Sequence, residues 1–186
     1  MRQTLVTPAA SQPVTLSEAK AQCRVLSNDE DAYINGLIAA ATAHAEKQTG
    51  RAILPQTWRL TLERFENEIT LPQSPLRSVA SVSYLDAAGA SQTLANSVYT
   101  VDVTSTPGRI VLAKDQEWPE TLESVNAVTI EYEAGYTVAP APIKHAILLL
   151  IGHWFAHREA VGEAAEELPL AVDALLVNFR AYGFVA

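Results

Sequence analysis

The stretch PAPIKHAILLLIGHWFAHREAV, residues 140–161, decides the fold of this chain. Within residues 146–156 only Gly152 and His153 are not apolar. A helix that crosses a bilayer needs about 20 apolar residues, so this run is too short to span a membrane. A helix that is apolar nearly all round packs against partners on several of its sides. We therefore expect this helix at the centre of a helical bundle.

Two helices are predicted before residue 55. Thr15 and Glu18 have the spacing of a capping box, which predicts a short helix that begins after Thr15. Residues 27–29, Ser-Asn-Asp, are expected to break that helix and to cap the next one. Apolar residues then recur at steps of three and four over residues 31–49, the period of an amphipathic helix. Gly50 suits the left-handed residue that ends such a helix.

Residues 55–136 change to a period of two, which predicts strands. Trp58, Leu60 and Leu62 alternate with polar residues, and so do Val128, Ile130 and Tyr132. The segments between them that we expect to be strands are 78–86, 92–94, 99–103 and 109–113. No helical pattern separates these segments, so six or seven strands should pair mostly antiparallel.

The C-terminal part returns to helix, and Pro169 opens a last helical segment. The pattern therefore predicts an α+β fold, in which N- and C-terminal helix pairs form a bundle and a mostly antiparallel β block is inserted between them. We expect the N-terminal helices of the bundle in residues 1–54, the β insertion in 55–138 and the C-terminal helices in 139–186. The three segments are expected to form one compact unit.

Composition and charge restrict the function. The chain has 186 residues, of which 48% are hydrophobic and 18% charged, as in an ordinary globular protein. Its formal net charge is −8 and no two Lys or Arg residues are adjacent, so the clustered cations of a DNA-binding protein are missing. The N-terminus lacks the apolar core of a secretory signal, which favours a cytoplasmic location. The single cysteine excludes an internal disulfide.

Three histidines raise the alternative of a small metal-dependent hydrolase. His153 and His157 are four residues apart on the apolar helix, and His145 lies eight residues before His153. Two imidazoles at that spacing can reach one metal ion. A zinc protease helix needs glutamate directly after its first histidine, and Trp154 stands there. We therefore interpret the histidines as structural, and expect no metal and no catalytic residue.

Other candidate sites have ordinary structural explanations. The acidic residues 29–31 lie where a helix N-terminus favours negative charge. Cys23 is expected to act as a small buried apolar residue, because its helix turns it inward. No glycine-rich phosphate loop occurs, and we expect no cofactor.

The ordered segments of the chain resemble the head–tail connector (adaptor) family of tailed bacteriophages, whose members also occur in prophages and gene transfer agents. The segments that carry the resemblance are PVTLSEAK (13–20), TGRAILPQTW (49–58), LPQSPLRSVASVSYLD (71–86), YEAGY (132–136), PIKHAILLLIGHWFAHREAV (142–161) and LPLAVDALLVNFR (168–180). They extend over nearly the whole chain in the same order. A tail-completion or stopper protein of the same module is a second alternative.

The resemblance implies a structural virion protein that forms a ring, typically a dodecamer, beneath the portal. Such a ring extends the DNA channel at the head–tail junction and offers a platform for the tail-completion protein. Its partners are then other copies of the chain, the portal, the tail-completion protein and double-stranded DNA that passes without sequence-specific binding. No membrane partner is implied, and assembly takes place in the host cytoplasm.

Two sets of site residues follow as hypotheses. By analogy with related connectors, the portal contact is placed on Phe179, Arg180, Tyr182 and Phe184. Aromatic and Arg side chains are common at binding hot spots, although the same segment could instead dock on its own bundle. The candidate acidic wall of the channel consists of Glu163, Glu166 and Glu167, which would repel the phosphates of passing DNA.

Overall fold

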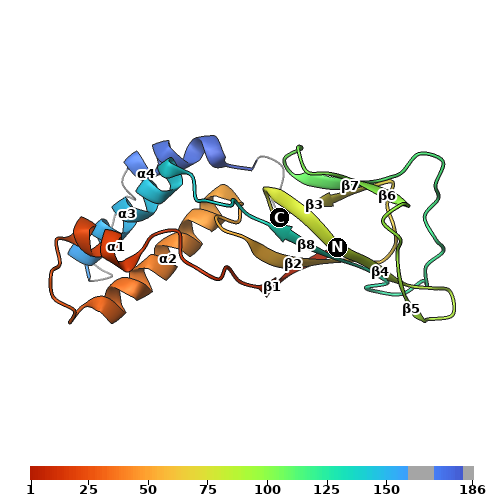
Figure 1. Ribbon diagram of the computed structural model, residues 1–186, viewed down its shortest axis with the longest axis horizontal. Helices are drawn as coiled ribbons and strands as arrows, with labels where there is room; N and C mark the ends of the chain where they lie inside the picture. Colours follow the sequence, from red (N-terminus) through yellow and green to blue (C-terminus); the bar gives the residue numbers. More distant parts are fainter. Residues whose placement is uncertain (159–169, 182–186) are drawn as a thin grey trace. The chain divides into compact units, whose positions relative to one another are not determined.

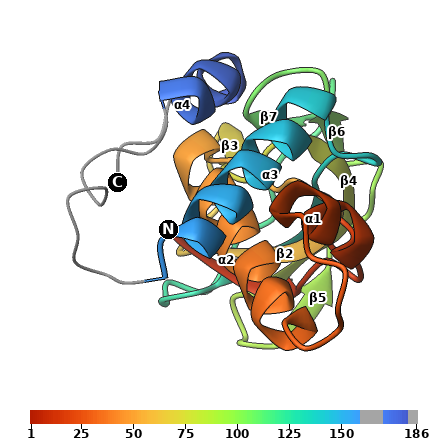
Figure 2. The same ribbon diagram turned by 90° about the vertical axis from the view of Figure 1, so that its left-hand side faces the viewer.

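The computed structural model describes residues 1–158 and 170–181, and this part of the chain combines helices with two antiparallel sheets (Figures 1 and 2). The helices are α1 (Leu16–Cys23), α2 (Asp31–Thr49), α3 (Ala141–Ala156) and α4 (Leu170–Leu176), and the 3-10 turn η1 (Val177–Phe179) follows α4. The strands are β1 (Arg2–Thr7), β2 (Gln56–Leu62), β3 (Glu68–Leu71), β4 (Leu76–Leu85), β5 (Ser91–Thr93), β6 (Tyr99–Asp102), β7 (Gly108–Leu112) and β8 (Val128–Ala134). The predicted α+β class, with a bundle of N- and C-terminal helices and an inserted antiparallel β block, is confirmed.

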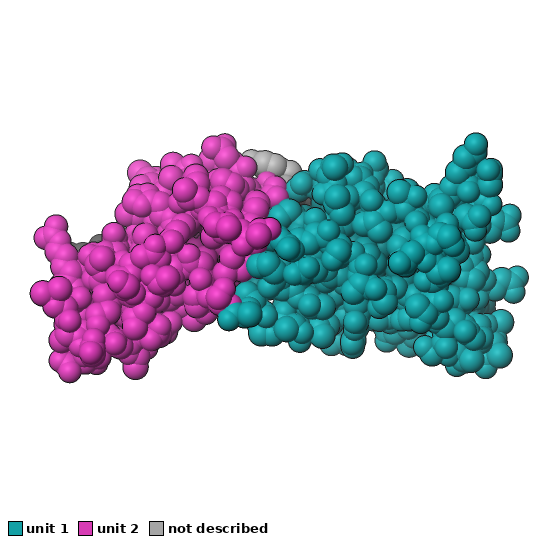
Figure 3. Space-filling model, in the orientation of Figure 1, with its two compact units in different colours: residues 1–10, 55–135, 183–186 teal, residues 11–54, 136–182 magenta. Residues whose placement is uncertain are grey.

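The described residues divide into two compact units (Figure 3). The helical unit contains residues 11–54, 136–158 and 170–181, and the sheet unit contains residues 1–10 and 55–135. That the segments 1–54, 55–138 and 139–186 behave together as one compact unit stays a prediction.

Helix α3 is the core of the helical unit, because it packs against α1, α2 and α4 (Figure 2). Its fully buried side chains are Ile143, Ala146, Ile147, Leu150 and Ile151. These positions recur at steps of three and four, while the half-buried Leu148 and Leu149 fill the positions between them. The nearly all-round apolar sequence is explained by neighbours on several sides.

Local signals set the ends of α1 and α2. The Thr15 hydroxyl accepts a hydrogen bond from the Glu18 backbone, and the Glu18 carboxylate accepts one from the Thr15 backbone, as the capping box requires. The Glu18 carboxylate also meets the Lys144 ammonium at 2.6 Å, and these hydrogen bonds lower the pKa of Glu18 to about 2. Gly50 ends α2 with a φ of 66°, the left-handed conformation that glycine adopts without strain.

The predicted cap of α2 is wrong. We expected the Ser-Asn-Asp sequence at 27–29 to supply the capping side chain, but Glu30 occupies the N-cap and makes no side-chain hydrogen bond there. Asn28 instead accepts a hydrogen bond from the Lys20 ammonium at 2.8 Å, and Asp31 accepts another at 2.7 Å. Lys20 of α1 therefore binds the last part of the α1–α2 loop and the first residue of α2, and the Asn28 side chain bonds to Lys20 instead of capping α2.

In the sheet unit, one sheet has the order β1-β2-β8-β4-β5 and the other has the order β3-β7-β6. The register of β2 and β8 places Trp58 opposite Tyr132 and Leu60 opposite Ile130. The alternation that predicted these two strands thus buries one set of side chains, including Leu60, Ile130 and Tyr132.

Strands β1 and β3 were not predicted. Strand β1 is the edge of its sheet and is almost entirely exposed, so its sequence RQTLVT lacks an apolar alternation. The buried Tyr132 side chain holds this strand, because the Gln3 amide donates a 3.0 Å hydrogen bond to the Tyr132 hydroxyl. The Gln73 backbone donates a second one, and burial of the Tyr132 side chain raises the pKa of its hydroxyl.

Among the described helices, none is both long enough and apolar enough to cross a membrane.

Candidate functional site

The histidines at the end of α3 interact with one another and with the backbone. The rings of His153 and His157 lie 4.7 Å apart between centroids, and His157 Nδ1 is 3.0 Å from the backbone oxygen of His153. His145 is exposed on the same helix. Within residues 1–158 and 170–181 no three His, Cys, Asp or Glu side chains gather as a metal site would require.

Arg158, two residues after the end of α3, connects that end of the helix with the start of α2. Its guanidinium carbon lies 4.8 Å from the ring centroid of Tyr33 and 4.7 Å from that of Phe155, within the range of cation–π contact. Its Nη2 is also 3.0 Å from Glu30 Oε1. No role was predicted for Arg158 from the sequence. The aromatic residue three positions earlier, Phe155 in the last turn of α3, was the signal that could have suggested this contact.

Two other residues considered in the sequence analysis, Asp31 and Cys23, have structural roles, and one of them differs from the expectation. Asp31 at the start of α2 pairs with Lys20, as an acidic residue near a helix N-terminus can. Cys23 is half-buried rather than fully buried, which corrects the expectation of a core position. Burial raises the pKa of the Cys23 thiol, which disfavours the reactive thiolate.

The described part of the expected portal contact, Phe179 and Arg180, lies against the C-terminal end of α2. The Phe179 backbone oxygen accepts a 2.5 Å hydrogen bond from Arg51 Nε, and the Arg180 guanidinium donates a 3.0 Å bond to Gln48. The backbone N–H of Ala181 donates to the backbone oxygen of Thr49 at 2.8 Å. Residues 179–181 therefore dock on the helical bundle.

The other residues of the two hypothesised sites lie outside the described residues. They are Tyr182 and Phe184 of the portal contact, and Glu163, Glu166 and Glu167 of the acidic channel wall.

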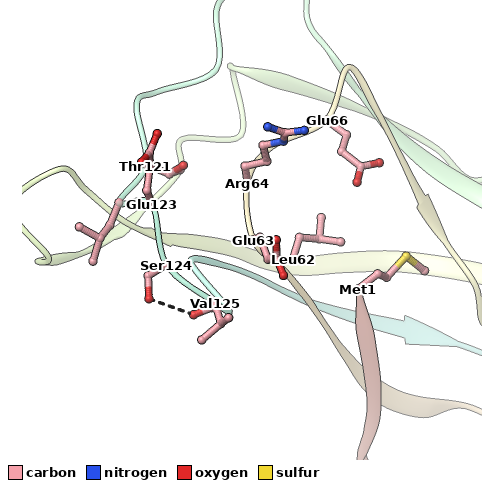
Figure 4. A pocket seen from close by; sticks show the side chains of 10 residues that line it. Met1, Leu62, Glu63, Arg64, Glu66, Thr121, Glu123, Ser124 and Val125 are labelled. Carbon is pink, nitrogen blue, oxygen red and sulfur yellow. Dashed lines mark hydrogen bonds between the residues drawn. The ribbon is translucent and has the colours of Figure 1, made fainter.

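The sheet unit contains a pocket of about 700 Å³ that sequence analysis did not find (Figure 4). One wall is the chain that leaves β2, residues 62–66, and the other is residues 121–125, before β8. Met1 also lines the pocket. The two walls lie almost 60 residues apart in the sequence, and neither carries a recognisable motif, so no sequence signal joins them.

The pocket combines an apolar surface with a surplus of negative charge. Val125, which is 71% exposed, and the half-buried Leu122 contribute apolar surface, whereas Leu62 is almost fully buried. Glu63, Glu66 and Glu123 supply three carboxylates, whereas Arg64 supplies a guanidinium and Met1 the N-terminal amino group. Such a surface suits an apolar side chain that is accompanied by a positive charge.

Comparisons with known proteins agree with this structure. The family model of the phage gp6-like head-tail connector protein matches residues 13–106. The matched range is just over half of the chain and extends from α1 to the turn after β6. A comparison with curated protein sequences found no match.

Three solved structures of similar fold come from gene transfer agent particles. A chain from the neck of an empty particle, computed with C6 symmetry, has a TM-score of 0.81 and 22% identity. A chain from the virion of a native particle has a TM-score of 0.80 and 23% identity. A chain from the neck of a native particle, computed with C12 symmetry, has a TM-score of 0.77 and 22% identity. Each alignment covers 100% of this chain and 98% of the other.

At these identities the solved structures establish the likeness of fold, whereas the family match rests on the sequence itself. That match includes the capped helix α1, the helix α2 and the first strands of the inserted sheets. The predicted resemblance is thereby confirmed: the chain belongs to the phage gp6-like head-tail connector protein family and is a structural connector protein.

Proposed function

We propose that this connector assembles as a ring of twelve copies beneath the portal, extends the DNA channel and provides the docking platform for the tail-completion protein. The observation that carries the proposal is the family match over residues 13–106. The ring is supported by the fold, which is similar to that of a chain from a particle neck computed with C12 symmetry. Copies would meet in the host cytoplasm during assembly and reside at the head–tail junction of the virion.

The charge of the chain supports the role of a channel that DNA passes without being held. The formal net charge is −8, and the 13 Lys and Arg residues are dispersed along the sequence. Affinity for DNA depends on how many phosphates are neutralised by such cations, so a dispersed set gives weak retention. In this proposal the wall that faces the DNA carries Glu163, Glu166 and Glu167.

The portal contact is proposed for Phe179, Arg180, Tyr182 and Phe184. Residues 179–181 are held at the C-terminal end of α2 by the Arg51 side chain, which donates to the Phe179 backbone oxygen, and by the backbone bond from Ala181 to Thr49, so they can direct the chain that follows them from a fixed point. Aromatic side chains and arginine supply much of the binding energy at protein interfaces. The two described members remain partly accessible, because both are half-buried.

Removal of residues 182–186 is expected to abolish binding to the portal protein and to leave the helical unit folded. The physical reason is that the contacts of residues 179–181 with α2 remain in the shortened chain. Binding is measured by co-purification with the portal protein of the same particle, and folding by circular dichroism. The longer deletion of residues 179–186 should also abolish attachment.

The matched control for this deletion is Leu170→Ala, which removes an apolar side chain that is 78% exposed on α4. This variant should bind the portal as the unaltered chain does. Portal binding that survives both deletions would contradict the assignment of the contact to the C-terminal segment.

A further inference from the structure

The loop between α1 and α2 exposes a large apolar side chain, that of Leu26, to solvent. Leu26 is 98% exposed, the largest exposure among the described large apolar residues. A single exposed leucine is ordinary, but this one follows closely after Arg24, an exposed cation without an ion pair in the described part of the chain. Residues 24–26 therefore offer a positive charge and an apolar group together, and the acidic residues of the loop, Asp29 and Glu30, follow them in the sequence.

The loop is held in a defined conformation. Arg24 has a φ of 56°, in the left-handed region, and its backbone N–H bonds to the oxygen of Ala21. The backbone N–H of Val25 donates a 2.9 Å bond to the oxygen of Lys20, whose ammonium also bonds to Asn28. A loop that is already ordered loses little conformational entropy when it binds a partner.

The pocket of the sheet unit has the complementary character. Its volume of about 700 Å³ exceeds that of one leucine side chain, and Leu122 and Val125 contribute apolar lining. Glu63, Glu66 and Glu123 form no ion pair with any described residue, so their charges are available to a cation from outside. Figure 4 shows Glu63 and Glu66 on one wall and Glu123 on the other.

We propose that the α1–α2 loop of one copy inserts Leu26 into this pocket of the next copy, with Arg24 facing the pocket carboxylates. The inference rests on the proposed function, in which copies of the chain form a ring. A ring requires a heterologous contact, in which two different patches of each subunit meet. The loop and the pocket are two such patches, since Arg24 and Leu26 of the loop match the carboxylates and the apolar lining of the pocket. The occupant of the pocket is thus a second copy of this chain.

Cysteine cross-linking tests this contact in assembled particles. The double variant Leu26→Cys/Val125→Cys is made in a Cys23→Ala background, which removes the single native thiol. Two cysteines can be bridged only when their Cα atoms are within about 7 Å, so a disulfide reports direct proximity. After oxidation with copper phenanthroline, the double variant should give a ladder of covalent multimers on a non-reducing gel. Either single cysteine variant can give no species larger than a dimer.

A matched control replaces the pocket position by another exposed valine of the sheet unit. Val103 is 46% exposed and does not line the pocket. Leu26→Cys/Val103→Cys should therefore give no ladder. A ladder of equal yield from this control, or assembled rings of the Val125 variant without a ladder, would overturn the proposal.

Charge reversal provides an independent readout. Arg24→Glu, added to the cross-linking variant, should lower the yield of the ladder about tenfold because like charges then meet in the pocket. Further addition of Glu63→Arg and Glu123→Arg should restore the yield. A ladder that Arg24→Glu leaves unchanged would contradict the part assigned to Arg24.

A missing loop-in-pocket contact and a missing ring give different experimental results. Electron microscopy of the same particles shows whether a ring is present at the neck. A ring without cross-links removes the loop-in-pocket contact and leaves the connector ring in place. Particles that contain the chain but no ring remove the proposed function as well.

Discussion

Replacement of Leu150 by alanine is expected to destabilise the chain by about 2 to 5 kcal/mol, the range measured for large-to-small substitutions in protein cores. Leu150 lies fully buried in α3, the helix that α1, α2 and α4 all contact. The substitution removes apolar contacts and leaves a cavity that the surrounding helices can close only in part. Urea unfolding followed by circular dichroism measures the loss.

The control for this experiment lies on the same helix. Leu148 is half-buried, so Leu148→Ala removes the same atoms from a less enclosed position and should cost less free energy of unfolding. Equal losses for the two variants, or a loss below about 0.5 kcal/mol for Leu150→Ala, the size typical of surface substitutions, would contradict the central position of α3.

Gly108→Ala is expected to destabilise the sheet unit by about 1 to 3 kcal/mol, as overpacking of a filled core does. A Cβ added at Gly108 would lie 2.5 Å from the Cβ of Leu76 and 2.6 Å from its Cδ2. The Cβ is fixed to the backbone of β4, so a rotamer change of Leu76 cannot relieve the contact. Backbone shifts between β7 and β4 would follow, and thermal unfolding measures their cost.

Gly36→Ala is the matched control, because the same added methyl group meets nothing within 4 Å on α2. Glycine within a helix is less stable than alanine by roughly 0.5 to 1 kcal/mol, so this variant should be more stable than the unaltered chain. A melting temperature of the Gly108→Ala variant equal to or above that of the unaltered chain would contradict the close approach at Gly108 as a limit on stability.

The helices were predictable because their signals are local. The apolar run of α3, the Thr15–Glu18 capping box and Gly50 each act within a few turns of one helix. The strands with regular alternation, such as β2 and β8, were predictable for the same reason.

The features that sequence reasoning missed depend on distant parts of the chain. Strand β1 is held by pairing with β2 and by the bond from Gln3 to Tyr132, neither of which leaves a pattern in residues 2–7. Glu30 occupies the N-cap of α2, and the side chain of Asn28 is bonded to Lys20 of α1, a contact that the local sequence pattern does not reveal.

The candidate sites also divide into features with a local sequence signal and features that depend on distant parts of the chain. The resemblance to connectors was visible in the sequence, and the family match over residues 13–106 confirms it. The apolar helix, which lies outside that match, is α3 of the structure. The pocket was not visible, because residues 62–66 and 121–125 become neighbours only when the sheet unit folds. The contact of Phe179 with Arg51 likewise joins residues 128 positions apart.

The most direct test of the connector role is deletion of the gene in its native phage or prophage, followed by electron microscopy of the induced particles. We expect tailless heads beside free tails, with DNA lost from some of the heads, because nothing joins the portal to the tail. Intact, infectious particles would contradict the head–tail connector role.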